Sequence, residues 1–320
     1  MTQLPVHIIS RATVESITER PPIPYGDLNN YLDSRPGILD DGNCDIFQPN
    51  CRSERQAYTR FDLFDIKDHV ESGTVVVFPP WLELFENYGV RHHIAACIDW
   101  LKANFQSNPV VVAWNHDRDQ STVPELQDLP ENFFVLCYNT SQKSPNDIVL
   151  PFWNVATNQT WRWDAERPLQ GGFYGYVGGL KVRQRMLAEF RDMPNWYVAD
   201  ADKEGRLSEE GYILRMMRWD FALCPRGGGL NSYRFYESIQ CGCVPVLFAD
   251  DVQLPYPDLP WGSIICRIPE EDAGNFERVC LLLDAVRVES RRKRIAAVRQ
   301  RFALGGVQEE IHTRITEFLL

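Results

Sequence analysis

The clearest pattern in the first half of the chain is a series of short apolar runs. Each run is followed by polar turn residues, as expected for buried parallel strands. The runs cover residues 73–78, 109–114, 132–138 and 147–151. A segment of helical periodicity, residues 90–105, separates the first two runs. This alternation predicts an open, parallel α/β sheet, whereas the first 60 residues contain little periodic signal and are predicted to be loop-rich.

The same rhythm restarts after residues 153–171, a mixed aromatic and polar segment that we interpret as a linker. The second set of predicted strands comprises residues 173–175, 195–198, 221–224 and 244–248. Predicted helices lie between these strands, at residues 182–190, 209–218 and 231–241, and helical patterns close the chain at 287–301 and 307–320. We therefore expect two α/β domains in series, residues 1–155 and 156–320, with a cleft between them.

Composition and charge narrow the range of partners. The formal net charge of the 320-residue chain is -11, which disfavours nucleic acid as a partner. The sequence has no apolar run long enough for a transmembrane helix, and its first 20 residues lack the apolar core of a signal peptide. Nine cysteines, an odd number, suggest reduced thiols, so we expect a cytoplasmic protein without a transmembrane segment.

The most informative segment is residues 221–237, in which an apolar strand stops at Pro225 and three glycines follow Arg226. Gly227 and Gly228 would let the backbone approach a ligand closely. A helix would then begin with Asn231 or Ser232 as its N-cap, and its free N–H groups favour an anion. Residues 221–236 include two arginines, Arg226 and Arg234, and no acidic residue. The residues by themselves indicate an anion or nucleotide site.

Glu237 follows Arg234 by three residues, so both side chains lie on one helical face. A carboxylate one turn below a phosphate site is well placed to accept hydrogen bonds from a ribose diol. A locally positive segment lined by N–H groups suits a diphosphate. It is not a Walker loop, because no Gly-Lys-Ser/Thr sequence follows the glycines.

The order of these motifs resembles the signature of the exostosin-type glycosyltransferases. The matching elements are Pro225-Arg226-Gly227, then Ser232, Arg234 and Glu237 in one helix, then Gly242-Cys243-Val244-Pro245-Val246 and Asp250. Upstream, Asp147 to Pro151 resembles the family's Lys-Asp-apolar-Pro element, with Asn146 at the basic position. Phe173-Tyr174-Gly175 followed by Arg183 resembles a further element, and Leu254-Pro255 and Trp261 fall at similar downstream positions. The resemblance covers roughly residues 147–261.

This resemblance implies a GT-B fold, with two Rossmann-like domains whose parallel sheets face a central cleft. It implies an inverting transfer of a sugar from a nucleoside-diphosphate-sugar to a hydroxyl of a glycan acceptor, without a cofactor or an obligatory metal. It also implies which residues bind the donor. The diphosphate would be contacted by Arg226, Ser232 and Arg234, with Arg183 as a further candidate. Glu237 would contact the hydroxyls of the ribose or the sugar. Two alternatives are another GT-B enzyme, such as a fucosyltransferase-like protein, and a non-catalytic nucleotide- or glycan-binding module of the same fold.

Inverting transfer requires a general base that accepts the proton of the acceptor hydroxyl. The first candidates are His116 and Asp117, in the polar loop after the strand at 109–114. A second group follows the first strand and comprises Glu83, Glu86, His92 and His93. For any one of these residues, an ordinary role at the protein surface or in a helix cap is the alternative.

No metal site is predicted. The pair Asp200 and Asp202 has the spacing of a metal-binding Asp-x-Asp motif, but we interpret it as a turn or helix cap. Cys241 and Cys243 have poor spacing for zinc and are expected to be small buried residues. Residues 287–301 carry seven basic side chains against Glu289, which indicates a solvated helix face that meets acidic neighbours, with an acidic glycan or membrane surface as the alternative.

Overall fold

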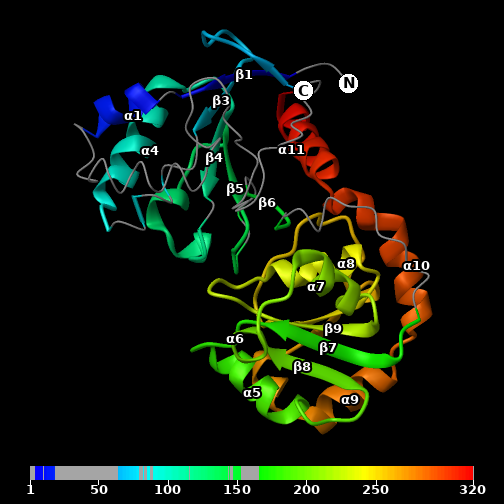
Figure 1. Cartoon of the computed structure of the whole chain (residues 1–320). Helices are drawn as coiled ribbons and strands as arrows, with labels where there is room; N and C mark the ends of the chain where they lie inside the picture. Colours follow the sequence, from blue (N-terminus) through cyan, green and yellow to red (C-terminus); the bar gives the residue numbers. More distant parts are fainter. Residues whose placement is uncertain are drawn as a thin grey trace. The chain divides into compact units, whose positions relative to one another are not determined.

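The computed structural model describes residues 4–9, 11–18, 64–78, 82, 85–86, 89–114, 116–142, 144, 147–152 and 166–319. Its contacts divide the chain into two compact units, Met1–Leu150 with Leu304–Leu320, and Pro151–Ala303. Each unit contains a parallel sheet accompanied by helices (Figure 1). The predicted α/β class with two parallel sheets is therefore confirmed.

The sheet of the first unit has the strand order β2-β1-β3-β4-β5-β6, and every neighbouring pair is parallel. Its strands are β1 (Leu4–Ile8), β2 (Phe64–Ile66), β3 (Val75–Phe78), β4 (Val110–Trp114), β5 (Phe133–Cys137) and β6 (Asp147–Val149). Its described helices are α1 (Arg11–Ile17), α4 (His92–Asn104), the short 3-10 turns η1 (Gln120–Thr122) and η2 (Pro124–Leu126), and α11 (Leu304–Leu319). The four strands and the helix predicted for this half are all present.

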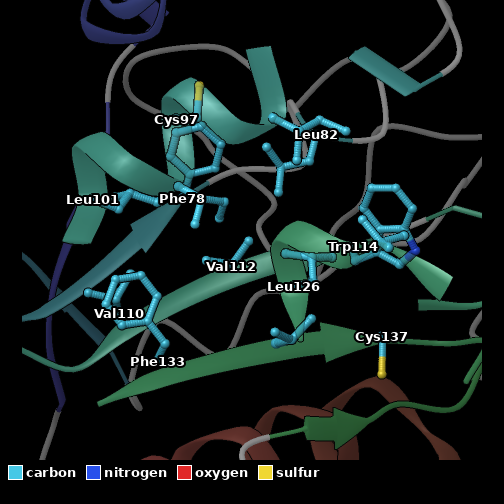
Figure 2. Packing of buried hydrophobic residues seen from close by; sticks show 14 of the residues in the cluster. Phe78, Leu82, Cys97, Leu101, Val110, Val112, Trp114, Leu126, Phe133 and Cys137 are labelled. Atoms are coloured by element: carbon cyan, nitrogen blue, oxygen red, sulfur yellow. The ribbon is translucent and has the colours of Figure 1, made fainter. Parts of the chain in front are cut away.

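The core of the first unit forms where α4 covers the central strands. Phe78, Val110 and Val112 from the sheet meet Cys97 and Leu101 of α4, and all are nearly inaccessible to solvent (Figure 2). These strands are apolar on successive positions because both faces of a parallel sheet are covered. In Figure 1, α11 lies on the side of this sheet opposite α4.

The sheet of the second unit has the order β11-β10-β9-β7-β8, again with parallel neighbours throughout. Its strands are β7 (Leu169–Gly175), β8 (Trp196–Asp200), β9 (Trp219–Pro225), β10 (Val244–Phe248) and β11 (Cys266–Ile268). Its helices are α5 (Lys181–Phe190), α6 (Ala201–Glu204), α7 (Glu209–Met216), α8 (Tyr233–Gln240), α9 (Phe276–Asp284) and α10 (Val288–Val298), with 3-10 turns η4 (Trp261–Ser263), η5 (Glu270–Gly274) and η6 (Arg299–Phe302). Helices α7 and α8 lie on one side of the strands and α5 and α9 on the other (Figure 1).

Several elements differ from the sequence prediction. Strand β1 and helix α1 lie within the first 60 residues, which were predicted to be loop-rich. Strand β7 begins at Leu169, inside the predicted linker, most of which (153–165) lies outside the described residues. The contacts group α11 with the first unit, whereas the sequence analysis assigns residues 304–320 to the second domain.

The strand order places a topological switch point in the second unit. From β7 the chain moves to β8 on one side of the sheet and then to β9 on the other. Helices that follow β7 and β9 therefore leave toward opposite faces, and their first turns flank a crevice at the carboxyl ends of these strands. Open α/β sheets bind ligands at such crevices. The segments after Gly175 and Pro225 are thus where a ligand site is expected.

Candidate functional site

The loop between β9 and α8 is held in shape by its own hydrogen bonds. The backbone N–H of Gly227 donates to the carbonyl of Asn231 (3.1 Å). The side chain of Asn231 accepts from the N–H of Ser232 (2.8 Å) and donates to the hydroxyl of Tyr236 (2.6 Å). Ser232 is the N-cap of α8, with an extended backbone (φ -147°, ψ 140°), as the sequence predicted, but its side chain makes no capping bond.

Helix α8 places Arg234 at the carboxyl end of β7. The guanidinium of Arg234 is 7% exposed, lies 4.0 Å from the ring centroid of Phe173, and donates from Nη2 to the carbonyl of Tyr174 (2.6 Å). Its Nε and Nη1 atoms are buried and have no hydrogen-bond partner among the described residues. A buried donor without a partner costs roughly 1–3 kcal/mol, and more when it is charged. Two donors of this guanidinium are therefore available to an acceptor such as an anion.

Arg183, on α5, approaches the same strand end from the other face of the sheet. Its Nε donates to the carbonyl of Arg226 (2.9 Å) and its Nη1 to the carbonyl of Tyr176 (2.6 Å), so it joins the segments after β9 and β7. Burial, together with the nearby charge of Arg234, lowers the pKa of Arg183 to about 10. Arg183 is therefore still charged at neutral pH. Among the described residues, no carboxylate forms an ion pair with Arg183 or Arg234.

Glycines leave room for these guanidinium groups. A methyl group on Gly175 would overlap Nη2 of Arg234, and one on Gly227 would lie 3.5 Å from Nη2 of Arg183. Phe173 lies between the two arginines, with its ring centroid 5.8 Å from the guanidinium carbon of Arg183. The absence of a side chain at Gly175 is thus required for the position that Arg234 occupies.

The other residues predicted to bind the diphosphate have different surroundings. Arg226 is half-exposed and its Nε lies 2.8 Å from a carboxylate oxygen of Glu270. Gly228 is exposed at the tip of the loop, and Ser232 is buried beside the first turn of α8. The fold therefore brings Arg183, Gly227, Asn231, Ser232 and Arg234 together, whereas Arg226 contributes its carbonyl to Arg183 and its charge to an ion pair with Glu270.

Glu237 lies one turn further along α8, as predicted, and is 7% exposed. One of its oxygens accepts a hydrogen bond from the hydroxyl of Tyr212 on α7 (2.9 Å). Burial and the Glu237 carboxylate raise the pKa of Tyr212 well above its ordinary value. Tyr212 therefore remains a donor and holds the carboxylate in one orientation.

Together these groups form a positively charged cluster at the switch point of the second unit. Two guanidinium groups, the glycine-containing loop and the first turn of α8 all lie at the carboxyl ends of β7 and β9. Such a cluster binds an oxyanion through charge-assisted hydrogen bonds. The predicted general-base candidates, by contrast, lie in the first unit.

The loop after β4 carries those candidates. Asp117 is exposed, and His116 is half-buried and accepts a hydrogen bond at Nδ1 from the backbone N–H of Arg118 (2.8 Å). Next to them, burial alone would raise the pKa of Asp119, but hydrogen bonds from Ser141 and Ser121 outweigh this and lower the pKa below its ordinary value. Asp119 thus stabilises the loop.

Of the second group of base candidates, Glu86 and His93 are held within the first unit, whereas His92 is exposed. One oxygen of Glu86 accepts from Arg118 (2.6 Å) and the other lies 3.0 Å from Nε of Arg91. His93 is buried, and burial followed by the neighbouring His92 lowers its pKa. Glu83 lies outside the described residues.

The features that could have indicated a metal have structural roles. Asp200 is the N-cap of α6 and accepts from the N–H of Asp202, which confirms the predicted cap. Cys241 and Cys243 are fully buried, and burial raises the pKa of both thiols. Within the described ranges, no group of three or more His, Cys, Asp or Glu side chains could hold a metal ion.

Several arginines of α10 and η6 form ion pairs or hydrogen bonds with other residues of the second unit. Arg301 forms a bidentate ion pair with Asp258 (2.5 and 3.0 Å), and Arg292 pairs with Glu289 (2.9 Å). Arg291 and Arg294 donate to carbonyls in and after η4. The predicted pairing of this stretch with acidic neighbours is confirmed for these two pairs. None of the helices in the described ranges has the length and hydropathy needed to cross a membrane.

Sequence reasoning missed three contributors to the site. Phe173 supports both guanidinium groups, Gly175 admits Arg234, and Tyr212 orients Glu237. The signal for the first two was present, because the Phe-Tyr-Gly run ends a predicted strand. Their link to Arg234 depends on the pairing of β7 with β9, which the sequence pattern does not specify.

A family model described as the Exostosin GT47 domain matches residues 91–280. A probable glucuronosyltransferase of Oryza sativa subsp. japonica is 34% identical over 112 residues, which are 35% of this chain and 24% of that protein. The probable beta-1,4-xylosyltransferase IRX10L of Arabidopsis thaliana is 29% identical over 139 residues, 43% of this chain and 30% of that protein. The matches thus span less than a third of either relative.

Among solved structures, the pneumococcal O-GlcNAc transferase GtfA in complex with UDP and GlcNAc aligns with a TM-score of 0.43 and 11% identity, over 78% of this chain and 58% of that one. The glycosyltransferase SnogD from Streptomyces nogalater aligns with a TM-score of 0.36 and 13% identity, over 76% and 72%. The family match extends from the helix α4 of the first unit through the whole switch-point site to α9. The chain belongs to the exostosin GT47 family.

Proposed function

We propose that this protein is an inverting glycosyltransferase that moves a sugar from a nucleoside-diphosphate-sugar to a hydroxyl of a glycan. The observation that carries the proposal is the buried guanidinium of Arg234, whose Nε and Nη1 have no partner among the described residues. Both atoms carry N–H groups that can donate charge-assisted hydrogen bonds to phosphate oxygens. Family membership supports the same activity.

Each group of the site has a role in this reaction. Arg234 and Arg183 would bind the diphosphate and stabilise the charge that develops on it as the bond to the anomeric carbon breaks. The first turn of α8 would add backbone N–H groups. Glu237, oriented by Tyr212, would accept hydrogen bonds from ribose or sugar hydroxyls. Since two arginines supply the positive charge, we propose that no metal ion is obligatory.

The hydrogen bond at His116 favours Asp117 as the general base. Because Nδ1 of His116 accepts from the backbone of Arg118, a neutral His116 would carry its proton on Nε2. Neither nitrogen then offers a free lone pair to an acceptor hydroxyl. Asp117 is exposed in the same loop and has a carboxylate suited to this task.

The names of the relatives suggest the donor class. They include a probable glucuronosyltransferase and a probable beta-1,4-xylosyltransferase. We therefore propose a hexuronosyl or pentosyl donor and a polysaccharide acceptor. The cytoplasmic location expected from the cysteines stays a prediction.

The activity can be tested with a panel of uridine- and guanosine-diphosphate sugars. The wild-type protein should slowly release nucleoside diphosphate from one donor, and adding the correct glycan should accelerate release. The variant Asp117→Asn should bind the donor as the wild type does but lose transfer by at least about a hundredfold, within the range for a lost general base. Donor binding without any turnover on the panel would instead support a non-catalytic binding module.

A further inference from the structure

The second unit has an open groove that the donor site does not use. It encloses about 690 Å³ between the turn after β7, helix α5 and helix α6. The residues that matter here are Tyr176 and Gly178 in the turn, Gln184 and Arg191 on α5, and Asp202 and Lys203 on α6. Ligand sites in proteins typically measure 300–1,000 Å³, so the groove can accept a molecule of the size of one or two sugar rings.

Tyr176 gives the groove an aromatic surface. Its side chain is 54% exposed, which makes it one of the few large apolar groups on the described surface. The ring lies directly against Gly178, where a methyl group would overlap it, and Gly178 has a φ of +45° that favours glycine. The backbone of Tyr176 is fixed as well, because its carbonyl accepts the hydrogen bond from Arg183 (2.6 Å). The ring thus contacts Gly178 and leaves more than half of the side chain open to solvent.

The polar side chains of the groove carry both signs of charge. Arg191 and Lys203 are exposed and form no ion pair with a described carboxylate, and Asp200 and Asp202 add two negative charges. Gln184 donates to the carbonyl of Gly178 (2.6 Å) and keeps its side-chain oxygen as an acceptor. Two cations and two carboxylates give no net charge, so the groove does not select for a phosphate. Mixed donors and acceptors around an aromatic ring instead suit hydroxyl groups, each of which donates and accepts.

We propose that this groove binds pyranose rings of a glycan, as a site separate from the nucleotide site. Rings joined by equatorial β1,4 bonds present flat C–H faces that stack on an aromatic side chain, and their hydroxyls point outward toward polar neighbours. Tyr176 supplies the stacking surface, and Arg191, Asp202 and Lys203 supply the hydrogen bonds. None of the side chains proposed to contact the glycan is assigned to the diphosphate, and Arg183 only holds the backbone of Tyr176.

The proposal can be tested by titrating the full chain with cellohexaose and with xylohexaose. Saturation-transfer NMR should show transfer to the sugar ring protons for at least one of the two, in the absence of nucleotide. Tyr176→Ala should raise the dissociation constant by about tenfold or more, the equivalent of one lost stacking contact. Leu281→Ala is the matched control, since it removes a similarly exposed apolar side chain (72%) outside the groove and should bind as the wild type does.

Three results would overturn the proposal. The wild type could bind neither hexasaccharide, or Tyr176→Ala could bind as well as Leu281→Ala. Glycan binding could also be lost in Arg234→Met, which would mean that the sugar had occupied the nucleotide site. Retained glycan binding in Arg234→Met together with lost nucleotide binding would separate the two sites.

Discussion

Arg234 shows how a local arrangement that is poor for stability indicates function. Its charge is buried, one of its hydrogen bonds goes to a backbone carbonyl, and two nitrogen atoms are left without partners among the described residues. The contact with Phe173 contributes about 2 kcal/mol, comparable with the cost of one unpaired buried donor. Hydrogen bonds from Nε and Nη1 to an oxyanion would offset the cost of the other.

The space at Gly175 can be tested directly. In Gly175→Ala, the new methyl group would displace the guanidinium of Arg234, so affinity for a nucleoside diphosphate should fall by at least about tenfold, the equivalent of one charge-assisted hydrogen bond. Calorimetric titration measures this change. Gly179→Ala is the control, because a methyl group there meets nothing within 4 Å. Equal affinity in both variants would show that the position of Arg234 is unimportant.

Residue-scale predictions from the sequence were accurate where chemistry is local. The cap at Ser232, the turn before it and the orientation of Glu237 toward the same helical face as Arg234 follow from positions close in sequence. The pairing of Arg226 with Glu270 could not be predicted in this way, because the partner is 44 residues away and reaches the site through β11 and η5.

At the scale of elements, α8 is unusual because its residues from Arg234 to Gln240 are all buried. Its polar side chains are accommodated by neighbouring elements: Gln240 donates to the carbonyl of Arg299 (2.9 Å), and Glu237 accepts from Tyr212 of α7. A surface helix would keep such groups in water. The helix is thus stable only in the packing of the second unit, and its bonds fix the angle at which its first turn meets the site.

The hydrogen bond from Tyr212 of α7 to Glu237 of α8 predicts that the stability of the protein depends on pH. Because the pKa of Tyr212 is raised well above 10.0, the unfolded chain loses this proton above about pH 10 while the folded protein keeps it. Stability from this group is therefore fully present below pH 10 and decreases as pH rises, by up to about 1.4 kcal/mol per pH unit. Tyr212→Phe lacks this group.

Denaturant unfolding at pH 8, 10 and 11 tests this expectation. At pH 8 the substitution should reduce the free energy of unfolding by roughly 1.5–3 kcal/mol, the contribution of a hydrogen bond to a charged group. The difference in unfolding free energy between wild type and variant should shrink at pH 11, because the contribution of Tyr212 decreases there. Other titrating groups affect both proteins equally. A difference that stays constant over this range would contradict the account of Tyr212.

At the scale of the whole molecule, the alternation of apolar runs and helical segments was sufficient to predict two parallel α/β units. Strand β1 was missed because Pro5 and His7 interrupt its five residues. Strands β2 and β11 were missed because a charged residue, Asp65 or Arg267, stands at the centre of each three-residue strand. The strand orders could not be read from periodicity either. They follow from long-range pairing, and they create the switch point that makes Arg183 and Arg234 neighbours.

Diphosphate binding at the ends of β7 and β9 is tested most directly by a calorimetric titration of the full chain with uridine and guanosine diphosphate. The wild type should bind at least one of the two. Arg234→Met keeps an unbranched apolar stem but removes the guanidinium, so it should bind the nucleotide at least about a hundredfold more weakly, the loss of about 2.7 kcal/mol. Arg278→Met, a change of the same kind at a surface ion pair of the second unit, should bind as the wild type does. Undiminished binding by Arg234→Met would contradict the account.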